Sequence, residues 1–137
     1  MYDLINAALL SLALAASDST ATQATSLAGT WHGTSTCVDK VHFPACKDEE
    51  VFYEARLTHS APDTVSIKAD RVVKGERLFM GELFFTAQPD SSWMADVHTS
   101  RVHFQLTLRR AGDRLTGVMI DLPSARRIRD IALERVR

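Results

Sequence analysis

Short runs of alternating apolar and polar residues, separated by turn residues, fill the chain from residue 27 onward. The clearest run is 101–109, where one face carries Val102, Phe104, Leu106 and Leu108. Successive side chains of a β-strand point to opposite faces, so this alternation predicts a half-buried strand. The same reasoning predicts eight strands, at 30–36, 51–58, 65–70, 78–87, 93–97, 101–109, 115–122 and 128–136.

The connections between these runs are short and rich in turn-forming residues, as at Lys74-Gly75, Pro89-Asp90 and Gly112-Asp113. Loops of this length join only antiparallel neighbours. Eight such strands make an up-and-down barrel or a two-sheet sandwich, and a barrel leaves no exposed edges. We therefore predict an all-β chain with one eight-stranded antiparallel up-and-down β-barrel over 27–137. Run 78–87, apolar on both faces around Gly81, predicts a strongly bent barrel strand.

The first residues have the pattern of a secretory signal. Residues 4–16 are almost all apolar, and Ala13-Leu14-Ala15 supplies the small residues that a signal peptidase reads. The run is too short to span a bilayer. We therefore predict a signal peptide at 1–16, a secreted or periplasmic location, and no membrane span in the mature form. Because no Lys or Arg precedes the apolar run, an incorrectly assigned start or a buried N-terminal helix stays open as an alternative. Residues 17–26, rich in Ser, Thr and Ala, predict a flexible N-terminal linker.

Two cysteines in a chain bound for an oxidising compartment predict a disulfide between Cys37 and Cys46. The alternative is a zinc site formed by these cysteines with His32 and His42. The spacing of the four residues does not match the recurrent zinc-binding patterns, so the disulfide is favoured. We predict no metal and no cofactor.

Composition and motifs narrow the function classes. A net charge of −1 argues against general nucleic-acid binding, which needs a strong basic excess. Residues 1–97 are acidic on balance and residues 98–137 are basic, which predicts ion pairs between strands of the two halves. The sequence has no nucleophile elbow, phosphate loop or dinucleotide fingerprint, so an enzyme is less favoured than a binding protein.

The segment Leu27-Ala28-Gly29-Thr30-Trp31 resembles the start of the calycin superfamily, which includes lipocalins, fatty-acid-binding proteins, avidins and a bacterial metalloprotease inhibitor. This resemblance implies that Trp31 closes one end of the core beneath an arginine, for which Arg127, Arg129 and Arg135 are candidates. The chain is also similar to small secreted bacterial barrel proteins with a Trp31-x-Gly33 start and a close Cys pair, a likeness that implies no particular activity. Compared with lipocalins, the chain is short and lacks their second and third motifs.

Two functions follow as expectations. The first is a binding protein that holds a small apolar or amphipathic molecule among Trp31, Tyr53, Phe84 and Phe104. The second is an interaction or protease-inhibitor-like module with a solid barrel, in which the N-terminal arm or the Cys37–Cys46 loop contacts a protein partner. The aromatic residues of the later strands are better explained by core packing than by a ligand cage, because an eight-stranded barrel is nearly filled by its own side chains; these residues are Phe79, Phe84, Phe85, Trp93 and Phe104.

Overall fold

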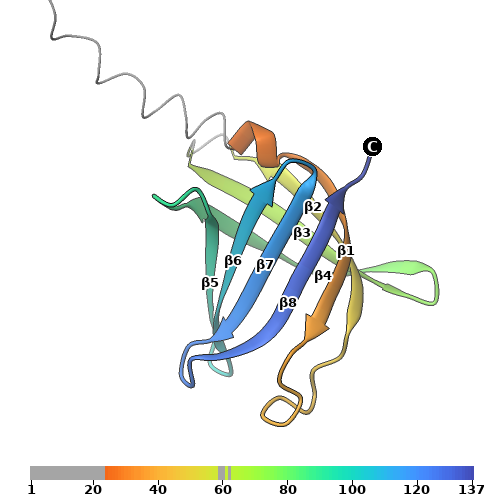
Figure 1. The fold of residues 1–137 in the computed structure, drawn as a ribbon, viewed down its shortest axis with the longest axis vertical. Coiled ribbons are helices and arrows are strands. Elements are labelled where there is room, and N and C mark those ends of the chain that lie inside the picture. The colour runs from red at the N-terminus through yellow and green to blue at the C-terminus, as the bar shows by residue number, and fades with distance from the viewer. Residues whose placement is uncertain (1–23, 59–60, 62) are drawn as a thin grey trace, which may run out of the picture.

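The structure, a computed structural model, describes residues 24–58, 61 and 63–137, and the predicted signal peptide and residues 17–23 of the predicted linker lie outside them. The described chain forms eight β-strands (Figure 1). The strands are β1 (Gly29–Cys37), β2 (Glu49–Leu57), β3 (Thr64–Val73), β4 (Glu76–Ala87), β5 (Trp93–His98), β6 (His103–Ala111), β7 (Arg114–Asp121) and β8 (Arg126–Arg135). These bounds lie within three residues of every predicted strand end.

Each strand pairs antiparallel with the next, and β8 pairs with β1, which closes the barrel. The predicted all-β, eight-stranded up-and-down barrel is therefore confirmed. The β1–β8 closure depends on Gly33, where an added Cβ would lie 2.1 Å from the backbone oxygen of Ala132. A side chain at this position would force the two strands apart.

One end of the barrel is closed by a short helical turn at residues 24–27, drawn in orange above the strands in Figure 1. Ala24 and Leu27 of this turn are buried in the core, so the last residues of the predicted linker belong to the folded domain. The indole Nε1 of Trp31 donates a hydrogen bond to the Leu27 backbone oxygen at 3.0 Å. The guanidinium of Arg135 lies over the Trp31 ring, 4.2 Å from its centroid, which selects Arg135 among the three candidates.

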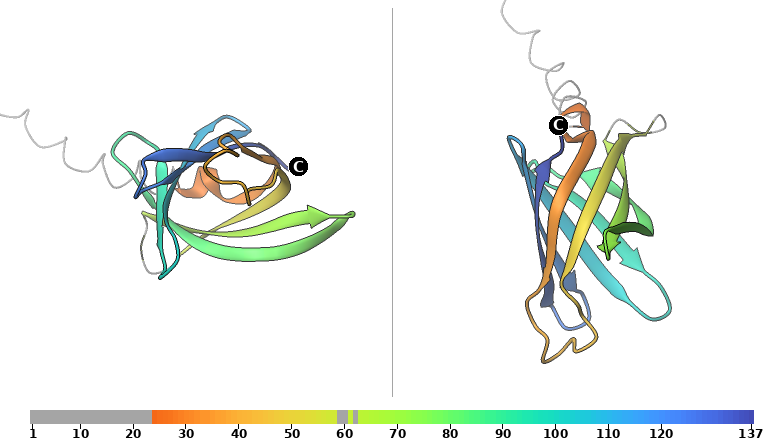
Figure 2. Two further views of the ribbon diagram at one scale, coloured as in Figure 1. Left: turned by 90° about the horizontal axis from the view of Figure 1, so that it is seen from below. Right: turned by 90° about the vertical axis from the view of Figure 1, so that its right-hand side faces the viewer.

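The barrel wall is incomplete between β4 and β5. β4 pairs with β3 at ten positions but with β5 at only two, Thr86↔Met94 and Ala87↔Trp93. The outer part of the β3–β4 hairpin bends away from the rest of the barrel (Figures 1 and 2). An irregularity in the β3–β4 register, where Ala69 pairs with Gly81 and Asp70 with Phe79, leaves Met80 as an extra residue. This bulge accounts for the bend in β4, which was predicted from Gly81 in the apolar run 78–87.

Large apolar side chains pack the closed half of the barrel. The largest fully buried ones are Trp31, Phe85, Leu27, Leu108, Leu115 and Leu133. Within the described part of the chain, no helix has the length and apolar character needed to cross a membrane.

Candidate functional site

The other half of the barrel contains a cavity of about 410 Å³. It lies where β1 and β5 end and where β2, β6 and β8 begin, at the end of the barrel that carries the β1–β2 loop. Its lining residues are Ser35, Glu49, Val51, Tyr53, Ala69, Met80, Gly81, Leu83, Val97, Phe104, Leu106, Met119 and Arg129. The cavity therefore combines a mainly apolar wall with a small group of polar side chains.

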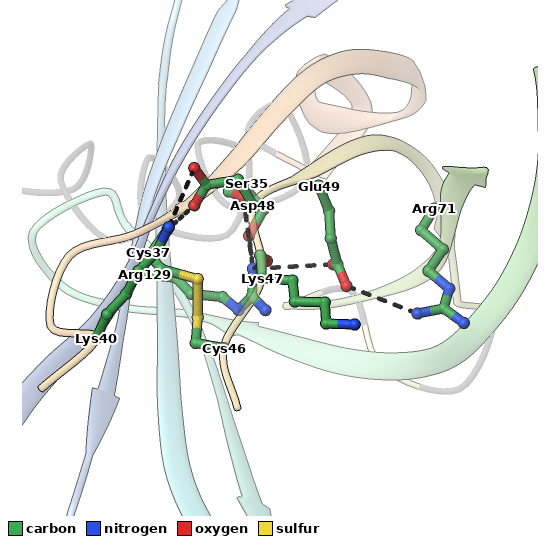
Figure 3. Close-up of a disulfide and its surroundings, with 9 residues drawn as sticks. All are labelled: Ser35, Cys37, Lys40, Cys46, Lys47, Asp48, Glu49, Arg71 and Arg129. Carbon is green, nitrogen blue, oxygen red and sulfur yellow. Dashed lines mark hydrogen bonds and ion pairs between the residues drawn. A yellow bond between two sulfur atoms is a disulfide. The ribbon is translucent and has the colours of Figure 1, made fainter. Parts of the chain in front are cut away.

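Arg129 organises the polar group. Its Nη1 donates hydrogen bonds to the Ser35 hydroxyl at 3.1 Å and to the Lys47 backbone oxygen at 2.9 Å. The same atom lies 3.8 Å from a Glu49 carboxylate oxygen, and Glu49 also forms a 4.0 Å ion pair with Arg71 (Figure 3). The side chains of Arg129 and Glu49 are only 15% and 19% exposed, so water screens this pair less than it screens a surface ion pair. Arg71 lies outside the lining, and together with Arg129 it places two guanidinium groups around the one carboxylate of Glu49.

Tyr53 lies in the same cavity, between Trp31 on β1 and Ala69 on β3 in the sheet register. Burial raises the pKa of the Tyr53 hydroxyl to about 12, with an opposing effect from the Arg129 guanidinium and a further rise from the Glu49 carboxylate. The phenol is therefore neutral at physiological pH and can donate a hydrogen bond.

The apolar wall borders the incomplete seam of the barrel. Met80, Gly81 and Leu83 come from β4. Across the seam lie Val97 of β5 and Phe104 of β6. A Cβ added at Gly81 would meet no heavy atom within 4 Å, so the space beside this glycine is open. The weak pairing of β4 with β5 thus leaves a lateral boundary of the cavity without a continuous hydrogen-bonded wall.

The β1–β2 loop lies beside the polar group and is closed by the disulfide between Cys37 and Cys46, which confirms the predicted bond (Figure 3). The Cys37 N–H donates to the Asp48 carboxylate at 2.8 Å, and Lys40 lies 3.8 Å from the same side chain. Because Lys47 accepts a hydrogen bond from Arg129, the loop is attached directly to a residue that lines the cavity.

Two of the four predicted ligand-binding residues, Tyr53 and Phe104, line the cavity. Trp31 is fully buried in the closed half and is not part of the lining. Phe84 lies on the outer face of β4, 61% exposed, so the structure does not bring it together with the other three; its neighbour Phe85 points inward and is 1% exposed. The expectation that Phe84 points into the barrel is corrected by the inside–outside alternation along β4.

Arg129 was expected only as a candidate to cover Trp31, and neither it nor Glu49 was predicted to form a polar group inside the barrel. A signal for both was present, because Glu49 continues the inward alternation of Val51 and Tyr53. Arg129 likewise precedes the inward residues Ile131 and Leu133 at a spacing of two. A charged residue in such a register is easily read as the solvated end of a strand.

The four residues of the alternative zinc site have other partners. The two cysteines form the disulfide. The His32 side chain forms a hydrogen bond with Glu50 at 2.7 Å, and the His42 side chain forms one with Asp39 at 2.9 Å. In the part of the chain that the structure describes, no three His, Cys, Asp or Glu side chains are grouped to hold a metal ion. The predicted ion pairs between the acidic and basic halves are present, for example between Arg129 and Glu49.

No known protein family matches this sequence, and no curated protein sequence resembles it significantly.

Proposed function

We propose that this calycin-like barrel is a binding protein for a small amphipathic molecule, held in the cavity beside Arg129. The observation that carries the proposal is the asymmetric lining, with charged and hydroxyl groups at one side and Met80, Leu83 and Phe104 at the other. Ligand sites typically combine a mostly apolar wall with a few polar groups that fix orientation. A volume of about 410 Å³ fits the size range of such sites.

The charges of the site favour a ligand whose polar group is neutral or anionic. Arg129 and Arg71 outweigh the single carboxylate of Glu49, and the neutral Tyr53 hydroxyl can donate a hydrogen bond. A cationic head group would meet the Arg129 guanidinium, while Arg71 already neutralises much of the Glu49 charge. The apolar part of the ligand would replace water along Leu83, Phe104 and Leu106, which the hydrophobic effect favours.

A fluorescent probe with the same chemistry tests the proposal. Anilinonaphthalene sulfonate combines apolar rings with an anionic group, and its emission rises when it binds apolar sites. We expect the wild-type chain to enhance its fluorescence, and Gly81→Leu to abolish most of the enhancement because the new side chain fills open cavity space. Phe84→Leu is the matched control on the same strand, since its side chain points outward and should leave binding unchanged.

Equal probe binding by the wild type and Gly81→Leu would show that the probe sits elsewhere and would count against the cavity. Circular dichroism and urea unfolding of Gly81→Leu are the control that checks whether the variant keeps its fold. Because Gly81 is not in a left-handed backbone conformation, the substitution adds no backbone strain of that kind.

We also propose that the protein acts outside the cytoplasm, with residues 1–16 removed as a signal peptide. The Cys37–Cys46 disulfide supports this proposal, because such bonds persist mainly in oxidising compartments. N-terminal sequencing of protein exported by its native host should begin after residue 16. An intact N-terminus on the exported protein would contradict the proposal.

The β1–β2 loop supports a second candidate function, an interaction or protease-inhibitor-like module. Val38 and Val41 are 43% and 87% exposed within the segment that the disulfide closes, so this loop presents two apolar side chains to a protein partner. The test is inhibition of a panel of secreted metalloproteases by the wild type and by Val41→Asp. Inhibition that Val41→Asp loses would favour the module, whereas absence of inhibition by the wild type would remove it.

A further inference from the structure

The edge of β4 that faces β5 is unpaired over most of its length. Pairing with β5 involves only Thr86 and Ala87, so the segment from Glu76 to Phe85 has no partner on that side among the described residues. This part of the strand also belongs to the hairpin that bends away from the barrel, which leaves its edge accessible (Figure 2). An edge of this kind presents free N–H and C=O groups that can pair with another strand.

Exposed apolar side chains gather on the same strand. Of the large apolar residues that are exposed, β4 carries Leu78, Phe79, Met80 and Phe84, and Val73 lies at the adjoining end of β3. Phe79 is the most exposed of this set at 63%. β4 has no proline and no lysine, two residues that commonly protect edges from pairing. Such a concentration of apolar surface marks a contact site more often than a solvated wall.

The bulge gives the strand a symmetric charge pattern. Arg77 and Glu82 are five positions apart, a spacing that places two side chains on opposite faces of a regular strand. The extra residue Met80 shifts this alternation. Arg77 contacts Asp70 and the Phe52 ring, Glu82 accepts from Ser66, and all three partners lie on the outer face. Both charges are thus on one face, on either side of the apolar centre at Phe79 and Met80.

We infer that β4 pairs antiparallel with β4 of a second copy of this chain about a two-fold axis between Phe79 and Met80. In this register Arg77 of each copy lies opposite Glu82 of the other, and Leu78 lies opposite Gly81. A two-fold interface makes each contact twice, so the single strand supplies two opposite-charge pairs. Registers shifted by one residue either way lose both pairs, so charge complementarity selects this one.

Sedimentation velocity of the full chain over a range of concentrations tests the inference. We expect a concentration-dependent dimer, and Glu82→Arg should raise its dissociation constant by about tenfold because two attractive pairs become two repulsive ones. The double variant Arg77→Glu/Glu82→Arg restores opposite charges in the same register and should recover most of the wild-type affinity. Glu134→Arg, an exposed charge reversal on β8, is the matched control and should leave the dimer unchanged.

Three outcomes would overturn the inference. One is a chain that stays monomeric at every concentration. Another is a dimer that Glu82→Arg does not weaken, or that the double variant does not recover. The third is a monomer that instead sediments with phosphatidylglycerol–phosphatidylethanolamine vesicles and loses this binding in Phe79→Ser, which would assign the β4 edge to a lipid surface. Cavity binding is read from probe fluorescence of the wild-type chain, and dimerisation is read from sedimentation of variants at Arg77 and Glu82, which do not line the cavity, so failure of either proposal leaves the other standing.

Discussion

The protonation state of a single residue in the cavity, Tyr53, affects the stability of the barrel. Its folded pKa of about 12 exceeds the ordinary value of about 10, so the folded state holds the phenol proton more tightly than the unfolded state. The Tyr53 proton therefore contributes to the free energy of unfolding by a constant amount below pH 10, and this contribution is lost as the pH rises from 10 to 12. The loss amounts to about 1.4 kcal/mol per pH unit.

Urea unfolding of the wild type and Tyr53→Phe at several pH values measures this effect. We expect the stability of the wild type to fall relative to that of Tyr53→Phe above pH 10, since the variant has no proton to lose at this position. The pH dependence of all other groups is common to both chains and cancels in the difference. Parallel curves for the two chains would mean that the Tyr53 hydroxyl titrates normally.

Arg135 holds the closed end together. Besides covering Trp31, its guanidinium donates to the backbone oxygens of Ala28 at 2.8 Å and Ser26 at 2.5 Å, which fixes the helical turn. We expect Arg135→Ala to lower the free energy of unfolding by about 2–4 kcal/mol, from one partly buried cation–π contact and two charge-assisted hydrogen bonds. Arg137→Ala is the control, because its ion pair with Asp113 is exposed to solvent and its removal should leave the free energy of unfolding nearly unchanged.

At the element scale, the disulfide fixes the β1–β2 loop next to the cavity. Chain-entropy arithmetic for a loop with a sequence separation of 9 gives about 2.5 kcal/mol of stabilisation. The variant Cys37→Ser/Cys46→Ser should lose about this much free energy of unfolding, measured with urea. It should also bind the anionic probe more weakly, because Lys47 helps to position Arg129. Unchanged stability and probe binding would show that the loop is held by its other contacts alone.

The strands themselves were predictable, because period-two alternation and turn residues act locally. Which side chains of a strand point into the barrel was predictable only where apolar and polar residues alternate cleanly, as in β6. β4 is apolar on both faces and contains a bulge, so the sequence could not assign Phe84 outward and Phe85 inward. The polar group was missed for a different reason. Arg129, Glu49 and Ser35 come from three strands that are distant in sequence, and only the closed barrel brings them together.

In the molecule as a whole, one end of the barrel is filled by side chains and the other end contains the cavity. Trp31, Phe85 and the helical turn fill the closed end, as expected for a narrow eight-stranded barrel. The other end keeps a cavity because β4 separates from β5 there and small residues such as Ala69 and Gly81 line the wall. The closed end therefore agrees with the expectation of a barrel filled by its own side chains. The proposed binding site lies in the other half of the interior.

Native mass spectrometry of the protein purified from its own host shows directly whether the cavity holds a ligand. We expect the wild type to give a species heavier than the chain by the mass of one small molecule. This added mass should be absent from Gly81→Leu and present in Phe84→Leu purified in the same way. A bare chain in the wild type, or the same added mass in Gly81→Leu, would contradict a ligand held in the cavity beside Arg129.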